Sequence, residues 1–328
     1  MPPGDFSNDR RTASRGLGPS RLIPHRRPLG RCGPRGLLLG RTGEAVGLVG
    51  ESGSGKSVSA FSIMGLLARP GRVSGGSIRF EGQELTALSE RSMAAIRGRE
   101  ISMVFQDPLS SLNPAFTVGQ QLVDTIRAHR PGIGRREARE RAADALSMVG
   151  IADPGARLGA YPHEFSGGMR QRVMIALAIS SKPKLLIADE PTTALDVTVQ
   201  AQVVELLETL REEMGLAILF ISHNLDLVAE LCDRVLVMYA GSVVEEGPVE
   251  ALFRSPEHPY TRLLQRCIPR IDRAEPLWSI EGAPPPLGTR IPGCAFADRC
   301  PEVMDKCRTA RPLPHGTASH AVSCWVTP

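Results

Sequence analysis

The chain has 328 residues, of which 42% are hydrophobic and 23% charged, and its mean hydropathy is −0.08. This length suits one large α/β domain with an appendage, or two ordinary domains, and the composition excludes a disordered, collagen-like or integral-membrane chain. The longest apolar runs, Leu216–Ile221 and Val235–Met238, are far shorter than the roughly 18 residues of a spanning helix. Any membrane role is therefore expected to be peripheral.

The net charge of +4 is concentrated at the N-terminus. Residues 1–41 hold nine Arg against Asp5 and Asp9, so they carry +7 and the rest of the chain carries −3. A body that is not basic argues against nucleic acid as a partner. Residues 1–41 are also rich in Gly and Pro and show no sustained period, which predicts disorder.

The seven cysteines fall into two groups. No apolar segment follows the basic N-terminal residues as it would in a secretory signal, so a reducing compartment is expected. Cys32, Cys232 and Cys267 are scattered and are expected to be inert thiols. The other four lie within the last 35 residues, at Cys294, Cys300, Cys307 and Cys324.

Apolar runs and turn signals after Glu44 predict an alternation of strands and helices. Alternation at these intervals predicts right-handed crossovers and a parallel sheet with both faces covered. The expected strands are Ala45–Val49, Ser77–Phe80, Ile101–Phe105, Leu185–Ala188, Ala217–Ile221 and Val235–Met238, and the expected helices include Ser57–Leu67, Arg135–Val149 and Val199–Met214.

A phosphate-binding loop is predicted between the first strand and the first helix, where the chain matches G-x-x-x-x-G-K-[ST]. The glycines let successive backbone N–H groups surround phosphate oxygens, and the helix N-terminus adds its positive end. Lys56 is expected to reach the β- and γ-phosphates, and the Ser57 hydroxyl to bind Mg²⁺. The expected nucleotide-binding residues are Gly50, Ser52, Gly53, Ser54, Gly55, Lys56 and Ser57.

Two carboxylates follow the apolar strand Leu185–Ala188. Asp189 is placed to hold Mg²⁺ through water, and Glu190 to polarise the attacking water as general base. Together with the phosphate loop, this pair predicts a phosphate-loop nucleotidase.

The run Phe165–Arg172 contains S-G-G-x-x-Q, and here the chain resembles the ATP-binding-cassette ATPases, whose signature loop has this pattern. Ser166, Gly167, Gly168 and Gln171 then form a second phosphate cradle at a helix N-terminus. One chain cannot wrap both cradles around the same γ-phosphate. In this family the signature loop serves the nucleotide of the opposite subunit, so the resemblance implies a dimer.

Three further elements fit the resemblance in order and spacing. Gln106 matches the glutamine that touches Mg²⁺ or water and relays the nucleotide state to the membrane subunits. Asp196, in Ala194-Leu195-Asp196, matches the loop that crosses to the partner ATPase, and His223 matches the switch histidine that contacts the γ-phosphate.

The resemblance extends to a subfamily, the ATPase subunits of dipeptide, oligopeptide and nickel importers. It rests on the runs Gln106–Pro114, Tyr161–Glu164 and Pro256–Thr261, and it covers about Glu44 to Trp325. Phe165 stands where the family usually has Leu, and Asn224 where it usually has Asp.

The subfamily implies both partners and a location. The partners are two integral-membrane permease subunits, a second, related ATPase that forms a heterodimer, and indirectly an extracytoplasmic solute-binding protein. The implied location is the cytoplasmic face of the cell membrane.

The cysteine-bearing tail resembles the C-terminal extension of the same subfamily. Gaps of five, six and sixteen residues separate Cys294, Cys300, Cys307 and Cys324, unlike the C-x₂-C pairs of a zinc ribbon. Four clustered thiols in a reducing compartment favour a metal over disulfides. A [4Fe–4S] cluster suits thiolates best, zinc next, and free thiols remain a third alternative.

Residues 1–41 do not fit the family. Its members carry, ahead of the phosphate loop, an aromatic residue that stacks on adenine, whereas here only Phe6 precedes the loop. One base dropped from a possible coding sequence of Arg31–Leu39 gives Gly-Ala-Val-Arg-Gly-Val-Ser-Phe-Ser, which is close to the family's strand at this point. Residues 1–41 are therefore interpreted as a disordered or frame-shifted segment.

The expected fold is α/β: a phosphate-loop ATPase core at 42–249 with a helical subdomain at about 90–184, and a small cysteine-containing extension at 250–328. The expected function is ATP hydrolysis, dependent on Mg²⁺, that drives uptake of peptides or related small solutes. One alternative is a soluble cassette ATPase that acts on nucleic acid or ribosomes, and another is a redox-sensing regulator built on the cysteine tail.

Overall fold

The structure is a computed structural model, and it describes residues 42–106, 111–193, 195–267, 278–286, 289, 291–317 and 319–327. The predictions about residues 1–41, and those on Ala194 and on residues 107–110, lie outside this part of the chain.

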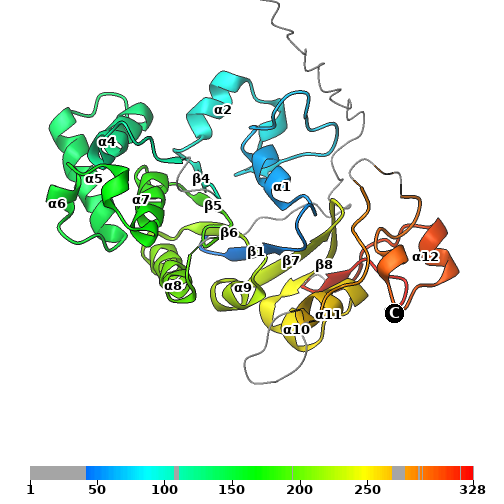
Figure 1. Cartoon of the computed structure of the whole chain (residues 1–328). Helices are drawn as coiled ribbons and strands as arrows, with labels where there is room; N and C mark the ends of the chain where they lie inside the picture. The colour runs from blue at the N-terminus through cyan, green and yellow to red at the C-terminus, as the bar shows by residue number, and fades with distance from the viewer. Residues whose placement is uncertain are drawn as a thin grey trace, which may run out of the picture.

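A mixed sheet runs through the middle of the molecule (Figure 1). In the described residues its strand order is β4-β5-β6-β1-β7-β8-β10-β9. The first five of these strands are parallel: β4 (Ile101–Val104), β5 (Leu185–Asp189), β6 (Ala217–Ile221), β1 (Ala45–Val49) and β7 (Arg234–Tyr239). The other three are antiparallel: β8 (Ser242–Pro248), β10 (Ala321–Val322) and β9 (His315–Gly316).

The parallel strands are apolar along their whole length because both faces of the sheet are covered. In β6, Ile218 and Phe220 belong to the core on one face, and Leu219 and Ile221 to the core on the other. This alternation follows from the two-residue period of a strand.

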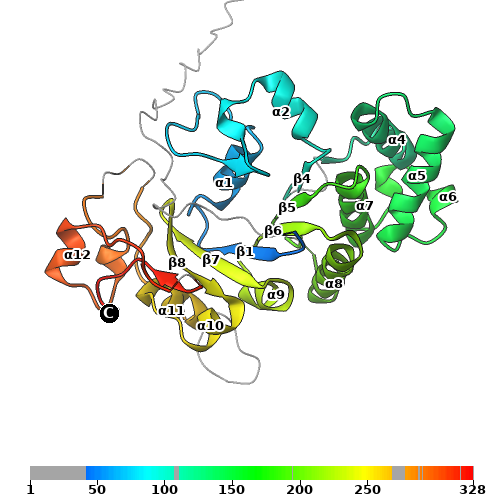
Figure 2. The same cartoon turned by 180° about the vertical axis from the view of Figure 1, so that it is seen from behind.

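Helices cover both faces and extend beyond one edge (Figures 1 and 2). One face carries α1 (Lys56–Ile63), α2 (Glu90–Ile96) and a separate hairpin of β2 (Arg79–Phe80) and β3 (Gln83–Glu84). The other carries α8 (Val197–Met214) and α9 (Leu225–Leu231). Beyond β4 and β5 lie α4 (Val118–His129), α5 (Arg135–Met148), α6 (Pro154–Arg157) and α7 (Gly167–Ile179).

The C-terminal part lies at the opposite end of the sheet (Figures 1 and 2). Its helices are α10 (Val249–Arg254), α11 (Pro259–Arg266) and α12 (Asp305–Thr309). Short 3₁₀ turns complete the described secondary structure at Leu85–Ala87, Pro162–Glu164 and Ala297–Arg299.

The α/β fold is confirmed, but the prediction of a wholly parallel sheet is wrong at one edge. β7 turns directly into the antiparallel strand β8 through Ala240 and Gly241, which have φ of 45° and 80°. Two central residues with positive φ make the type of turn that matches the twist of a hairpin. Three boundaries differ by two residues or more. The first helix ends at Ile63 rather than Leu67, the strand expected at Ser77–Phe80 is reduced to Arg79–Phe80, and the helix expected from Val199 begins at Val197.

The C-terminal extension contacts the sheet at β8, with which its strand β10 pairs. The centre of this contact is the buried carboxylate of Glu245 on β8. Glu245 accepts hydrogen bonds from the backbone N–H groups of Glu257 (2.8 Å) and His258 (3.0 Å), and it lies 2.9 Å from His320 Nε2. A buried carboxylate needs several such partners to offset its desolvation. The extension therefore docks on the edge of the sheet through specific polar contacts.

No described helix is long and apolar enough to cross a membrane.

Candidate functional site

The phosphate loop lies between β1 and α1, as predicted. Gly50 has φ of 149°, and a Cβ there would lie 2.1 Å from the carbonyl oxygen of Met238, so only glycine fits. Gly55, with φ of 105°, precedes the first turn of α1. Ser52 and Gly53 are exposed at the tip, whereas Ser54 is buried and its hydroxyl has no hydrogen-bond partner in the described structure.

Lys56 is the buried cation of this loop. Its ammonium group donates to the carbonyl oxygens of Gly50 (2.8 Å) and Glu51 (3.1 Å). Burial lowers the pKa of Lys56, although the carboxylates of Glu190 and Asp189 oppose that shift. A desolvated cation held over the loop can attract the phosphate oxygens of a nucleotide.

Asp189 ends β5 beside this loop, and Glu190 follows it. The Ser57 hydroxyl donates to Asp189 Oδ1 at 3.1 Å, and burial raises the pKa of Asp189. Glu190 has φ of 48°, a left-handed conformation that is unusual for a residue with a side chain. Strained conformations of this kind concentrate at functional sites.

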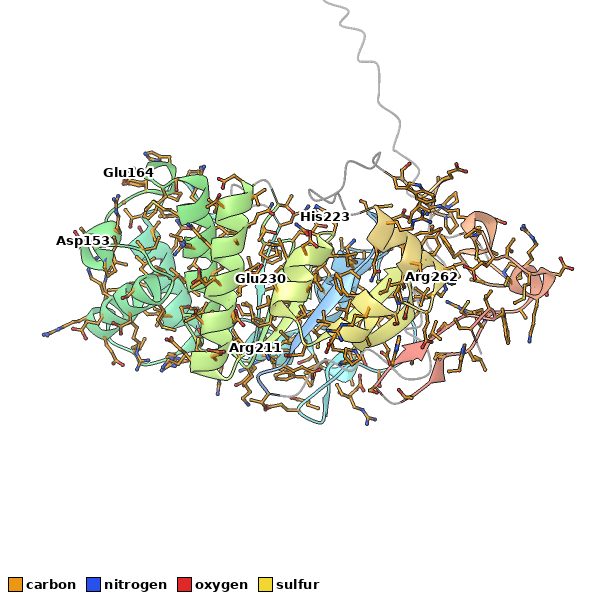
Figure 3. The ribbon with its side chains drawn as sticks, turned by 90° about the horizontal axis from the view of Figure 1, so that it is seen from below. Asp153, Glu164, Arg211, His223, Glu230 and Arg262 are labelled. Atoms are coloured by element: carbon orange, nitrogen blue, oxygen red, sulfur yellow. The ribbon has the colours of Figure 1, made fainter. Side chains whose placement is uncertain are left out.

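Three side chains surround one carboxylate oxygen, Glu190 Oε2. Gln106 Nε2 donates to it at 2.9 Å, the Thr193 hydroxyl donates at 3.0 Å, and His223 Nδ1 lies 3.5 Å away. Figure 3 shows His223 on one edge of the molecule, opposite Arg211. The structure thus brings Glu190, Gln106 and His223 together, and it adds Thr193, which the sequence did not single out.

The signature run lies at the N-terminus of α7. The Ser166 hydroxyl caps this helix by accepting from Met169 N–H at 3.3 Å, and Asp196 caps α8 in the same way through Val199 N–H at 2.9 Å. Within the described residues, no hydrogen bond joins Ser166, Gly167 or Gly168 to the phosphate loop. Gln171 differs from the others because its side chain is buried and its Nε2 atom has no partner in the described structure.

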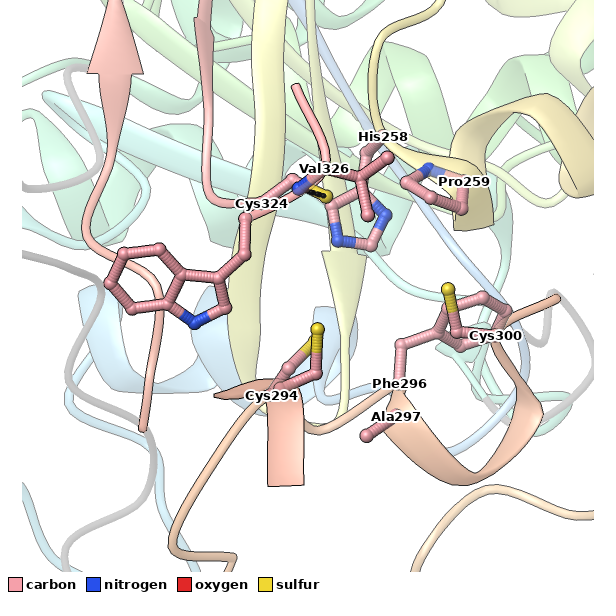
Figure 4. A pocket seen from close by; sticks show the side chains of 10 residues that line it. His258, Pro259, Cys294, Phe296, Ala297, Cys300, Cys324 and Val326 are labelled. Atoms are coloured by element: carbon pink, nitrogen blue, oxygen red, sulfur yellow. Dashed lines mark hydrogen bonds between the residues drawn. The ribbon is translucent and has the colours of Figure 1, made fainter. Parts of the chain in front are cut away.

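The four C-terminal cysteines line one small cavity, together with His258 and Phe296 (Figure 4). Burial raises the pKa of the Cys294 thiol, and it raises that of Cys300 to about 11. Among the described residues, no group of three or more His, Cys, Asp or Glu side chains is arranged to hold a single metal ion. The thiols share a cavity without meeting at one point.

His258 presents a hydrogen-bond donor to this cavity. Its Nδ1 accepts from Tyr260 N–H at 3.0 Å, so in the neutral ring the proton is on Nε2. Burial lowers the pKa of His258 to about 3, which keeps the ring neutral at physiological pH. The Nε2 atom is buried without a partner in the described structure. Figure 4 shows the His258 ring facing the same cavity as the sulfur atoms of Cys294 and Cys300.

Two of the scattered cysteines are described. Cys232 is buried, and burial raises the pKa of its thiol. Burial likewise raises the pKa of the half-buried Cys267. Thiols with raised pKa values react slowly, in keeping with inert side chains, while Cys32 lies outside the described residues.

Comparisons with known proteins identify the class. Residues 40–193 match the family model "ABC transporter", and residues 244–307 match "Oligopeptide/dipeptide transporter, C-terminal region". The chain is 51% identical over 273 residues to the dipeptide transport ATP-binding protein DppD of Escherichia coli, with 83% of each protein covered. It is 50% identical over 289 residues to a probable peptide ABC transporter ATP-binding protein of Sinorhizobium fredii, with 87% of this chain and 86% of the relative covered.

Solved structures agree with this. One is the cassette MJ0796, a dimer bound to ADP and Pi, which has a TM-score of 0.56 and 28% identity and covers 64% of this chain and 87% of that chain. Another is cbiO1 of Clostridium perfringens, which has a TM-score of 0.58 and 30% identity and covers 66% of this chain and 81% of that chain. The chain therefore belongs to the ATP-binding-cassette transporter ATPases, which couple ATP hydrolysis to transport. Within that family it carries the C-terminal region of the oligopeptide and dipeptide transporters.

Proposed function

We propose that the chain is the ATP-hydrolysing subunit of an importer for dipeptides, oligopeptides or related small solutes. The convergence of Gln106 and His223 on the Glu190 carboxylate, beside the phosphate loop, carries this proposal. The names of the relatives, which are dipeptide and peptide transport ATP-binding proteins, support the solute class.

In the proposed mechanism, the phosphate loop and Lys56 of one cassette hold ATP, and Ser166 and Gly167 of the opposite cassette close over its γ-phosphate. Glu190 accepts a proton from the attacking water, and Gln106 and His223 orient this carboxylate and the γ-phosphate. Exposed residues at a helix N-terminus, as Ser166 and Gly167 are, suit contact with phosphate on another subunit.

Magnesium is proposed to bind at Ser57 and Asp189, with Gln106 nearby, because the hydroxyl and carboxylate oxygens of the first two already lie 3.1 Å apart. When bound there, the ion would supply positive charge close to the phosphate oxygens. The oxygen donors present are of the kind that Mg²⁺ prefers.

The assembly proposed is two cassettes on two integral-membrane permeases, at the cytoplasmic face of the cell membrane, supplied by an extracytoplasmic solute-binding protein. The second cassette is proposed to be a related chain, giving a heterodimer. In the described part of the chain, residues 42–249 would form the ATPase domain and residues 250–328 the extension that docks on it.

Reconstitution with the permeases and the second ATPase in lipid vesicles tests this function. ATP-dependent uptake of a labelled dipeptide is expected, and it should be lost when this chain carries Glu190→Gln. ATP hydrolysis that responds to ribosomes or DNA and not to the permeases would contradict the proposal.

The cysteine cavity is proposed to hold a [4Fe–4S] cluster. Four thiols are the required donor set, and the buried Nε2–H of His258, which has no partner in the described structure, could donate to a cluster sulfur. A single zinc ion needs its ligands to converge on one point at about 2.3 Å, whereas a cluster takes each thiolate at a different iron. No such convergent group is present among the described residues.

Anaerobic purification tests this assignment. About four iron and four sulfide per chain, with absorption in the visible region, are expected for a cluster. One zinc per chain, or four alkylatable thiols and no metal, would contradict it.

A further inference from the structure

Glu51, the residue after Gly50 in the phosphate loop, is held by the C-terminal extension. Its two carboxylate oxygens accept from Arg299 Nη1 at 2.6 Å and Nη2 at 3.0 Å, a paired arrangement that is among the stronger hydrogen-bonded ion pairs. Its backbone N–H donates to the Tyr260 hydroxyl at 2.8 Å. Side chain and backbone of one loop residue are thus fixed by two residues that lie more than 200 positions away.

Arg299 is itself fully engaged. A guanidinium group has five N–H donors. Two bind Glu51, and the others bind the Tyr239 hydroxyl (3.2 Å) and the carbonyl oxygens of Ile280 (3.1 Å) and Glu281 (2.9 Å). The Arg299 side chain is only 6% exposed, so this pair is screened less than one on the surface. These five hydrogen bonds hold the Arg299 guanidinium in one orientation, and the Glu51 carboxylate is bound to it in that orientation.

Fixing Glu51 also fixes the surroundings of Lys56. The carbonyl oxygens of Gly50 and Glu51 are the acceptors of the Lys56 ammonium group. A displacement of the Glu51 peptide would move both these carbonyls and the N–H groups that follow. Misplacement by about 1 Å is enough to weaken binding and catalysis strongly.

We propose that Arg299 is a positioning residue of the ATP site, which makes the C-terminal extension a structural part of the phosphate loop. Arg299 acts through Glu51 and does not touch the nucleotide. The inference rests on the proposed function of the loop, and it holds whether or not the cysteine cavity contains a cluster.

The test compares Arg299→Met with Arg262→Met in the full chain, assembled with its partners. Arg262 makes an ion pair with Glu302 at 2.8 Å on the same extension and has no described contact with the phosphate loop. Arg299→Met is expected to raise KM for ATP about 10-fold or more, with a smaller change in kcat. Arg262→Met is expected to change both less than about 2-fold and, because its ion pair is exposed, to shift the thermal midpoint only slightly.

Two further variants decide the matter if Arg299→Met does not fold. Tyr260→Phe removes only the hydroxyl that accepts from Glu51, and Glu51→Gln removes only the charge of the pair. Both are expected to raise KM for ATP by at least about 3-fold. Where Arg299→Met does fold, adding Glu51→Gln to it should change KM little further, because the two residues act through the same contact.

Unchanged KM in Arg299→Met, or in both smaller variants, would overturn the proposal while leaving ATP hydrolysis by the wild type in place. A wild-type chain that does not bind ATP at all would instead refute the proposed function.

Discussion

The Ser57 hydroxyl donates to the Asp189 carboxylate at 3.1 Å, although 132 positions separate the two residues in the chain. The contact joins the first turn of α1 to the end of β5, where parallel strands present their carboxyl ends at one edge of the sheet. Ligands of α/β folds bind at this edge. The position proposed for the ATP site thus follows from the direction of the strands.

Removing either member of this pair should abolish most of the magnesium-dependent activity. Ser57→Ala or Asp189→Asn is expected to lower the ATPase rate by at least about 100-fold, equal to about 3 kcal/mol of transition-state stabilisation. Steady-state phosphate release measured against Mg²⁺ concentration checks this. Ser62→Ala is the control, because the Ser62 hydroxyl only donates to Val58 within α1. Equal losses in Ser62→Ala would contradict the assignment.

Glu190→Gln should stop hydrolysis while ATP still binds. The amide of glutamine cannot accept the proton of the attacking water, so a rate loss of about 100- to 10,000-fold is expected. Because the nucleotide then persists, size-exclusion chromatography with ATP should show more cassette dimer than the wild type does.

Thr193→Val gives a graded comparison with this variant. It removes one hydrogen bond to the Glu190 carboxylate and leaves the carboxylate itself in place. An effect of about 10-fold or less is expected. A Thr193→Val variant as inactive as Glu190→Gln would argue that Glu190 is not the proton acceptor.

The two glycines of the signature run should respond differently to alanine. A Cβ on Gly168 would lie 2.8 Å from Val199 Cγ1, whereas one on Gly167 would meet nothing closer than Leu195 Cδ2 at 3.9 Å. Gly168→Ala is therefore expected to cost about 1–3 kcal/mol of folding free energy through overpacking. Gly167→Ala should leave the thermal midpoint unchanged and still lower ATPase activity, because its methyl group occupies the surface proposed to face the partner's nucleotide. Thermal unfolding and ATPase assays on both variants check this, and equal unfolding shifts would show that the packing is not as described.

Changing His258 should affect the properties of a cluster without removing it. His258→Phe roughly keeps the ring volume but deletes the Nε2–H donor that faces the cysteine cavity, together with the Nδ1 atom that accepts from Tyr260 N–H. Loss of a hydrogen bond to sulfur is expected to lower the reduction potential of the cluster, since such bonds stabilise the added electron. Electrochemical titration followed by visible absorption measures this, with Cys300→Ser as the variant expected to lose iron altogether. A His258→Phe protein with normal potential would show that Nε2–H does not face the cluster.

Much of the fold was predictable because local sequence patterns indicate its strands and helices. The strands Ala45–Val49 and Ala217–Ile221 were located to the residue, since short apolar runs between turn signals mark strands buried on both faces. Strand β8 was missed because Ser242–Pro248 mixes polar and apolar residues and ends in Gly-Pro. Its pairing with β7 depends on the two-residue turn and on the extension that covers its other edge.

The sequence by itself predicted the residues proposed for the ATP site, because the chemistry of phosphate and magnesium binding requires particular residue types at fixed short spacings. Only the tertiary structure decided that Thr193 joins Gln106 and His223 at the Glu190 carboxylate, and that Arg299 holds Glu51 across 248 positions of the chain. Such contacts depend on how helices and strands pack, and an isolated Arg or Thr in the sequence carries no local signal of its distant partner. The order of motifs along the chain thus defines the chemistry, and the packing of the extension against the sheet defines what holds the phosphate loop in place.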